Sequence, residues 1–326
     1  MNLELFANTV WLADPAGFAA VVARVLSVRE CAKPREIAEA NAHMFARIDG
    51  LISVAAVSTG ETFHAELAEP SKAIRAVKGK VGVIPVWGPV QQRMSSELMK
   101  AGGTPLDFIA RAFDRMVADP SIGAIVLSID SPGGSSFGVE ELATKIKDAR
   151  SKKPIYAMAD SYAASAAYWL ASAASMVICT PSGVVGSVGV YVSHVDKSKA
   201  MADAGTVLTL VSSGKFKTEL ATNSPLSDDA RANLQRNVDE LHDTFISALK
   251  SNRGTTVENV RQNYGQGRVM SSGDALAAGM IDRVMSFEDL MARLTGGGAG
   301  VSGPGGMAAA QMDMLKIKAS RRYWAG

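Results

Sequence analysis

An α/β fold of repeated β-α units is predicted for this chain of 326 residues. Short apolar runs rich in β-branched residues, such as 122–129, alternate with segments of helical periodicity, such as 106–118. The strand-like runs are continuously apolar, which is typical of parallel strands covered on both faces. Repeated alternation of the two kinds of segment favours an α/β sheet over separate helical and β domains.

Three regions are expected along the chain. Residues 1–75 are predicted to form a mainly helical N-terminal segment, with helical periodicity over 15–28 and 37–48. Residues 76–290 are predicted to form the main domain. Residues 291–326 are predicted to form a Gly-rich linker followed by a short tail helix.

Within the main domain, each element is predicted from its own pattern. Strands are expected at 81–86, 122–129, 154–159, 176–180, 268–270 and 280–285. Helices are expected at 106–118, 139–150, 163–174, 227–251, 256–264 and 273–278. Ser227, Asp228 and Asp229 are suited to the start of the long helix, and Gly254 is suited to stop it.

Composition excludes several classes of protein. The net charge is +2, and Lys and Arg are scattered among nearly equal numbers of acids, so no nucleic-acid partner is expected. Residues 1–5 lack the pattern of a secretory signal. The uncharged stretch 161–195 is broken by Pro181 and Gly183, so we expect no stable membrane insertion and a cytoplasmic location.

Metal and cofactor chemistry is not expected. The two cysteines, Cys31 and Cys179, are too few for a disulfide framework and lack metal-ligand spacing. Cys179 follows an apolar run and is interpreted as a packed thiol. The four histidines are widely spaced and are interpreted as structural or surface residues.

Ser165 is the most informative residue. It lies in Tyr162-Ala-Ala-Ser-Ala-Ala-Tyr168, within the 35 residues from 161 to 195 that carry no Asp, Glu, Lys or Arg. Such a serine is either a small residue packed in an Ala-rich helix or a nucleophile. A serine hydroxyl is a weak nucleophile until a neighbouring base removes its proton. Because no histidine is placed to do so, a lysine in uncharged surroundings has to be considered as the base.

A glycine pair could supply the oxyanion site that acyl transfer needs. Asp130-Ser-Pro-Gly-Gly134 follows the strand expected at 122–129. Backbone N–H groups at Gly133 and Gly134 can approach a substrate closely because no Cβ intervenes. The alternative is a plain turn after a strand, and the segment alone does not decide between them.

Four segments together resemble a known family. Asp130-Ser-Pro-Gly-Gly134, Ala163-Ala-Ser-Ala-Ala-Tyr168, Val185-Gly-Ser-Val-Gly-Val190 and Ser213-Gly-Lys-Phe-Lys217 stand in the order found in the signal peptide peptidase A family of serine peptidases. The resemblance covers roughly residues 80–288 and is closest to the phage capsid-assembly protease branch. It implies a Clp-protease/crotonase-like fold, a Ser-Lys dyad and a ring-shaped homo-oligomer.

The resemblance also assigns roles to residues. Ser165 corresponds to the nucleophile and Lys217 to the general base, with Lys215 as a rival base two positions earlier. Ser187 corresponds to the hydroxyl that bonds the lysine amine, although it could instead be a polar turn residue. The oxyanion hole is expected from the N–H of Gly134 or Gly133 together with that of Ala166. Where many relatives have Gly-Gly after the nucleophile, this chain has Ala166 and Ala167.

The function implied is that of a soluble serine endopeptidase without metal or cofactor. Its expected substrate is a scaffold, a portal or its own chain during phage prohead maturation, in the host cytoplasm or prohead interior. An extended substrate is expected to add a strand near 185–190. The alternatives are a bacterial peptidase of signal peptides or membrane-protein fragments, a non-catalytic capsid assembly protein of the same fold, and an acyl-CoA enzyme of the crotonase class.

Overall fold

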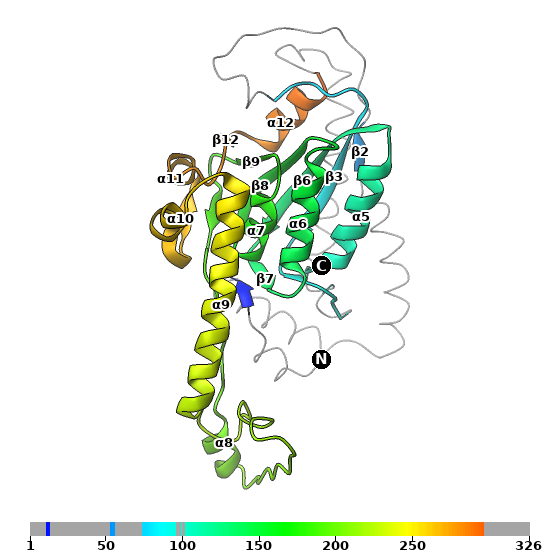
Figure 1. The fold of residues 1–326 in the computed structure, drawn as a ribbon. Coiled ribbons are helices and arrows are strands. Elements are labelled where there is room, and N and C mark those ends of the chain that lie inside the picture. The colour runs from blue at the N-terminus through cyan, green and yellow to red at the C-terminus, as the bar shows by residue number, and fades with distance from the viewer. Residues whose placement is uncertain (1–10, 14–52, 56–73, 96–98, 100–101, 297–326) are drawn as a thin grey trace, which may run out of the picture.

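The computed structural model of the protein describes residues 11–13, 53–55, 74–95, 99 and 102–296. Within these residues, strands and helices alternate along the chain, and the central strands are parallel. This confirms the predicted α/β fold of repeated β-α units (Figure 1). The helices expected at 15–28 and 37–48 and the tail helix fall outside the described residues.

Two sheets are formed in this part of the chain. The larger has the order β11-β10-β8-β6-β3-β2, with β9 beside β8 and β12 beside β9. Its strands are β2 (Ser53–Ala55), β3 (Lys80–Trp87), β6 (Ile122–Ser131), β8 (Ile155–Ala164), β9 (Met176–Cys179), β10 (Val184–Gly186), β11 (Val269–Ser271) and β12 (Arg283–Val284). The smaller sheet has the order β1-β7-β4-β5 and consists of β1 (Trp11–Ala13), β4 (Val90–Gln91), β5 (Thr104–Pro105) and β7 (Gly133–Ser135).

The helices follow the strands in sequence. They are α5 (Leu106–Ala118), α6 (Val139–Ala149), α7 (Ala166–Ser172), α8 (Ser198–Asp203), α9 (Asp228–Arg253), α10 (Val257–Asn263), α11 (Ser272–Ala277) and α12 (Phe287–Leu294), with a 3₁₀ turn at Gly265–Gly267. Among these described helices, none has the length and apolar character needed to span a bilayer.

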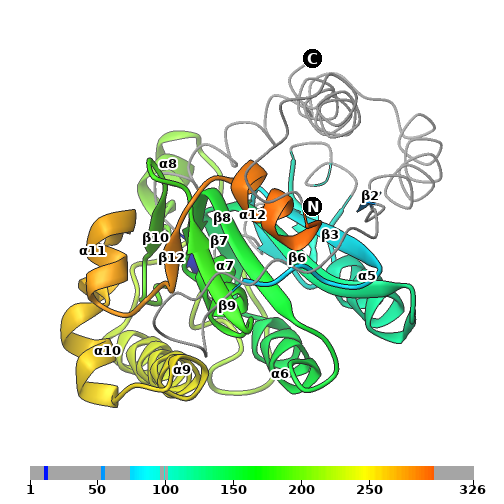
Figure 2. The same ribbon diagram turned by 90° about the horizontal axis from the view of Figure 1, so that it is seen from above.

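Helices cover both faces of the large sheet (Figure 2). On one face, Ile125 and Leu127 of β6 join a core that includes residues of α5, α6, α7 and α9. On the other face, Ala124 and Val126 of the same strand join a smaller core with residues of α12. Because neighbouring side chains point to opposite faces, a strand buried on both faces is apolar at successive positions, as residues 124–127 of β6 are.

Two predicted boundaries near Ser165 and at the N-terminus need revision. The helix expected from residue 163 starts only at Ala166, because Tyr162 to Ala164 pair with β10 and extend β8. An Ala-rich stretch favours a helix by intrinsic propensity, but pairing with β10 overrides that preference here. The segment 1–75 also contributes β1 and β2, which the sequence did not predict.

Helix α9 extends well beyond the sheet. Its 26 residues span about 39 Å, and its described buried side chains lie mostly in the C-terminal half. The Ser227 hydroxyl accepts a hydrogen bond from the Ala230 N–H, and Gly254 ends the helix with φ 63°, so both predicted ends are confirmed. The N-terminal half of α9 projects from the sheet, and α8 and the segment 204–227 lie at its far end (Figure 1).

A buried ion pair joins the end of α9 to the sheet. The guanidinium of Arg253 donates to both carboxylate oxygens of Asp282 at 2.9 Å, and the two side chains are only 7% and 9% exposed. Asp282 also accepts from the Val177 N–H of β9 at 2.8 Å. The pair therefore connects the end of α9 to β9 and to Asp282, the residue directly before β12.

We predict that Asp282→Ala lowers the free energy of unfolding by about 3–5 kcal/mol, because it leaves the Arg253 charge buried without a partner. Urea denaturation followed by circular dichroism measures this loss. Asp243→Ala serves as the control, because it breaks the exposed pair with Arg261 and should cost under about 1 kcal/mol. Equal losses in the two variants would contradict the assigned role of the buried pair.

Candidate active site

Three neighbouring parallel strands end side by side at the candidate site. In the register of β6 and β8, Ser131 lies opposite Ala163. In the register of β8 and β10, Ala164 lies opposite Gly186. The carboxyl ends of parallel strands in an α/β sheet are where functional residues gather. The segments that follow these strands, which carry Gly133, Ser165 and Ser187, therefore leave the sheet next to one another.

Ser165 occupies a sharp turn between β8 and α7. Its backbone has φ 55° and ψ −120°, a conformation rarely adopted by residues with a side chain. The Ser165 N–H donates to the Gly186 carbonyl at 2.6 Å, which holds the turn against β10. The hydroxyl is fully buried and has no hydrogen-bond partner among the described residues. A strained serine at a strand-to-helix turn is the geometry of a nucleophile elbow.

Large side chains fix α7, and with it the turn. Trp169 stacks on Phe245 of α9 with ring centroids 4.6 Å apart, and the Tyr168 hydroxyl donates to the Met280 carbonyl at 2.8 Å. Arg150 donates to the carbonyls of Ala173 and Ser172 at the end of the helix. This capping role of Arg150 was not predicted, because its sequence position carries no signal for a contact with α7.

Ser187 is the second strained serine. It has φ 53°, is 6% exposed and donates its N–H to the Arg268 carbonyl at 2.8 Å. Among the described residues, only Ser165, Ser187 and Gln266 are non-glycine residues with positive φ. Two of the three are thus the predicted site serines, at the ends of adjacent strands.

Gly133 and Gly134 form a short strand instead of a plain turn. β7 contacts α7 and pairs with β4, where Gly134 lies opposite Val90. A Cβ on Gly134 would lie 1.8 Å from the Val90 carbonyl oxygen, so only glycine fits. The Gly133 N–H donates to the Ser131 hydroxyl at 3.2 Å. The Gly133 N–H is therefore engaged within the chain, and the role of either glycine as an oxyanion donor stays a prediction.

Ala166 is the first residue of α7, and its backbone N–H has no acceptor within the helix. Its side chain is fully buried, so its methyl group is accommodated in the core. The N–H after a nucleophile is a common oxyanion donor. The position of Ala166 is compatible with its predicted role.

The structure does not bring Lys217 to Ser165 within one chain. Lys217 is exposed in the segment between α8 and α9, which lies at the far end of α9 from α7 (Figure 1). Its amine has no hydrogen bond or ion pair with any described residue. Lys215 is also exposed, and its amine lies 4.7 Å from the centre of the Phe216 ring. Both candidate bases therefore face solvent in the single chain.

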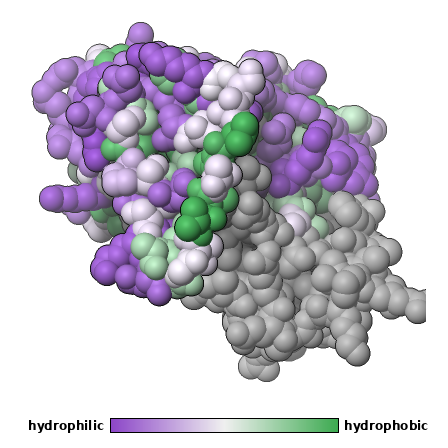
Figure 3. Space-filling view, turned by 90° about the horizontal axis from the view of Figure 1, so that it is seen from below, coloured by the Kyte–Doolittle hydropathy of each residue, from purple (hydrophilic) through white to green (hydrophobic). Residues whose placement is uncertain are grey.

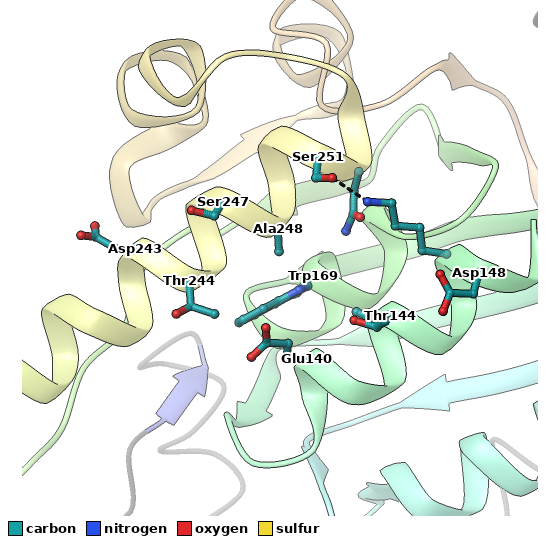
Figure 4. A pocket seen from close by; sticks show the side chains of 12 residues that line it. Glu140, Thr144, Asp148, Trp169, Asp243, Thr244, Ser247, Ala248 and Ser251 are labelled. Carbon is teal, nitrogen blue, oxygen red and sulfur yellow. Dashed lines mark hydrogen bonds between the residues drawn. The ribbon is translucent and has the colours of Figure 1, made fainter.

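A surface hollow and a buried thiol are two further features of the described residues, and neither involves the candidate catalytic side chains. A hollow of about 530 Å³ opens between α6 and α9, with Trp169 at its base (Figure 4). It contains none of the candidate catalytic residues, and Lys147 donates across it to Ser251 at 2.6 Å. Burial raises the pKa of the Cys179 thiol to about 11, which confirms a packed thiol and disfavours a nucleophilic one.

We predict that Ser165→Gly is more stable than Ser165→Ala by about 1 kcal/mol, because glycine relieves a backbone strain of about 1–3 kcal/mol at φ 55°. Both variants remove the hydroxyl, so the comparison isolates the backbone. Urea unfolding provides the measurement. The same pair at Ser172, inside α7, is the control and should show the opposite order. A less stable glycine at position 165 would argue against strain there.

Comparison with known proteins finds a peptidase family that part of this chain resembles. Residues 147–302 match the family model described as peptidase family S49. The chain is 30% identical over 220 residues to the head-tail preconnector protein GP5 of Enterobacteria phage P21, covering 68% of this chain and 43% of that protein. It is 30% identical over 213 residues to the capsid assembly protease C of Escherichia phage lambda, covering 65% and 48%.

A bacterial relative is also similar. Protease 4 of Haemophilus influenzae is 29% identical over 217 residues, covering 65% of this chain and 34% of that protein. The chain spans less than half of the length of each of these three relatives. Ser165, Ser187 and Lys217 all lie within the residues matched by the family model. Residues 147–302 of this chain are thus similar to peptidase family S49, and a phage capsid assembly protease, a phage head-tail preconnector protein and protease 4 are among its relatives.

Proposed function

We propose that the protein is a serine endopeptidase in which Ser165 is the nucleophile and Lys217 the general base. The observation that carries this proposal is the pair of strained serines, Ser165 and Ser187, at the ends of adjacent strands. Strain of this kind persists where the surrounding structure enforces it, and it concentrates at functional sites. The S49 match over the same residues supports a peptidase.

The proposed reaction has two stages. The Ser165 hydroxyl attacks the peptide carbonyl while Lys217 takes its proton, and the N–H groups of Gly134 and Ala166 stabilise the oxyanion. Lys217 then passes the proton to the leaving amine as the peptide C–N bond breaks. The acyl group stays bound to Ser165 as an acyl-enzyme. A water molecule, deprotonated by the same lysine, releases the acid and restores the Ser165 hydroxyl. Ser187 is proposed to orient the lysine amine.

We propose that the base reaches the nucleophile from another copy of the chain. Lysine acts as a base only when its amine is uncharged, and removal from water favours that form. In the single chain, Lys217 is exposed on a segment that projects from the sheet. We therefore propose that the homo-oligomer forms the active dyad, with Lys217 of one copy beside Ser165 of its neighbour.

An apolar strip next to Lys217 supports this assembly. Val207 and Val211 are 89% and 96% exposed, and Leu208, Leu210 and Phe216 are each about half exposed. The face on which this segment projects shows hydrophobic side chains among hydrophilic ones (Figure 3). Exposed apolar groups of this kind mark protein interfaces. A second copy is the proposed occupant, because burying the strip would also remove Lys217 from water.

A role in phage head maturation is proposed from the similarity to two phage proteins. One is named a capsid assembly protease and the other a head-tail preconnector protein. We propose that the substrates are a scaffold, a portal or the protein's own chain. The similarity to protease 4 supports the same chemistry and is compatible with a different substrate.

We predict that Ser165→Ala and Lys217→Met each lower the cleavage of unfolded, fluorophore-quenched casein about 10³-fold or more, because each removes one half of the dyad. Circular dichroism should show an unchanged fold. Lys215→Met is the matched control and should keep most of the activity. An active Lys217→Met variant with an inactive Lys215→Met variant would transfer the base to Lys215. Labelling of Ser165 by a fluorophosphonate tests the nucleophile directly.

We predict that Val211→Asp reduces both the oligomeric mass and the peptidase activity, because it places a charge in the proposed interface. Light scattering after size-exclusion chromatography gives the mass. Leu276→Asp is the control, since Leu276 is an exposed apolar residue on α11, away from the strip. A fully active Val211→Asp monomer would contradict assembly of the dyad between copies.

A further inference from the structure

The edge of β7 is occupied by a strand from the beginning of the chain. β1 pairs with β7 in antiparallel register, with Trp11 opposite Ser135, Leu12 opposite Gly134 and Ala13 opposite Gly133. On its other side, β7 pairs with β4. β1 is therefore the edge strand of the smaller sheet, next to both candidate oxyanion glycines (Figure 1).

An antiparallel strand at this place has the geometry of a bound peptide. Extended peptides bind to sheet edges through main-chain hydrogen bonds, so pairing needs no particular sequence. β7 follows β6 directly and contacts α7, whose first residue comes immediately after Ser165. A peptide on this edge thus pairs with Gly133 to Ser135, in the strand that contacts the helix beginning directly after Ser165.

The other candidate edge is closed along β10. A substrate strand was expected near 185–190, but Val184 to Gly186 of β10 are paired with β8 on one side and with β11 on the other, and residues 187–190 form no strand. A peptide would have to displace β11 to pair there. Among the described strands next to Ser165, the edge taken by β1 is therefore the better place for a substrate.

The burial of Ser165 fits an occupied site. A nucleophile has to meet its substrate, yet Ser165 is fully buried in the intact chain. We infer that the edge of β7 is the peptide-binding edge of the peptidase and that residues 11–13 occupy it as an internal peptide, which an incoming substrate has to displace. This inference rests on the proposed peptidase function and adds a means of controlling it.

Residues 11–13 can compete with a free substrate because they belong to the same chain as β7. Three residues of strand pairing bind weakly on their own, but a segment of the same chain binds intramolecularly, at an effective concentration set by the residues that connect it. A free substrate present at micromolar concentration is then disfavoured. Longer extended substrates, or removal of the N-terminal segment, would overcome the block.

A reversible crosslink tests this inference on the full chain. Residues directly opposite in an antiparallel pair have Cβ atoms about 4.5–5.5 Å apart, close to the separation that a disulfide bridges. The variant is Trp11→Cys with Ser135→Cys in a Cys31→Ser background, in which the remaining Cys179 is buried. Peptide mapping by mass spectrometry without reductant shows whether the bridge has formed.

We predict that oxidation lowers casein cleavage at least about tenfold and that reduction restores it, since the bridge keeps the internal strand in place. Each single cysteine variant, treated alike, should not respond. A crosslinked enzyme as active as the reduced one overturns the inference, as does failure of the bridge to form under oxidation. Inactivity of both forms, with no fluorophosphonate labelling of Ser165, would instead reject the peptidase proposal itself.

Leu12→Pro tests the same inference in the opposite direction. Proline lacks an N–H and fixes φ near −65°, far from the value of about −140° in antiparallel strands, so it should weaken the pairing of β1 and lower the KM for casein severalfold with little change in kcat. Leu12→Val is the matched control, because valine favours a strand and should keep the wild-type KM. An unchanged KM in the proline variant overturns the inference.

Discussion

One backbone hydrogen bond organises the site: the Ser165 N–H donates to the Gly186 carbonyl at 2.6 Å. It links the end of β8 to the end of β10 and enforces the unusual backbone of Ser165. The bond is possible because both strands run parallel and end together, while the aromatic anchors of α7 hold the other side of the turn. A local strain is thus maintained by a rigid sheet and core that lie outside the site.

The sequence predicts the core of the fold well because its strands are buried on both faces. β3, α5 and β6 lie where their apolar patterns place them, and the predicted ends of α9 agree with the structure. The Ala-rich stretch before Ser165 gives no such pattern, so the length of β8 depends on pairing with β10. The pairing of β1 with β7 joins residues far apart in sequence, which local patterns cannot reveal.

The candidate site is predictable as a set of residues and only partly as a geometry. Short motifs place Ser165, Ser187 and the glycine pair at strand ends, and the sheet brings those ends together. Lys217 belongs to a segment that lies at the far end of α9, away from Ser165, so the proposed dyad would depend on contacts that the single chain does not make. The spacing of motifs along one chain cannot predict which residues meet between two chains. The exposed valines Val207 and Val211 on the same segment are the feature that points to such a contact.

Gly134 has a consequence for the redesign of this domain. Its missing side chain leaves room for the Val90 carbonyl, so random libraries at this position should return glycine alone. Cleavage preference would then have to be altered through neighbouring positions whose side chains can vary. The backbone of β7 would stay in place, so any engineered pocket would have to be built around its existing position.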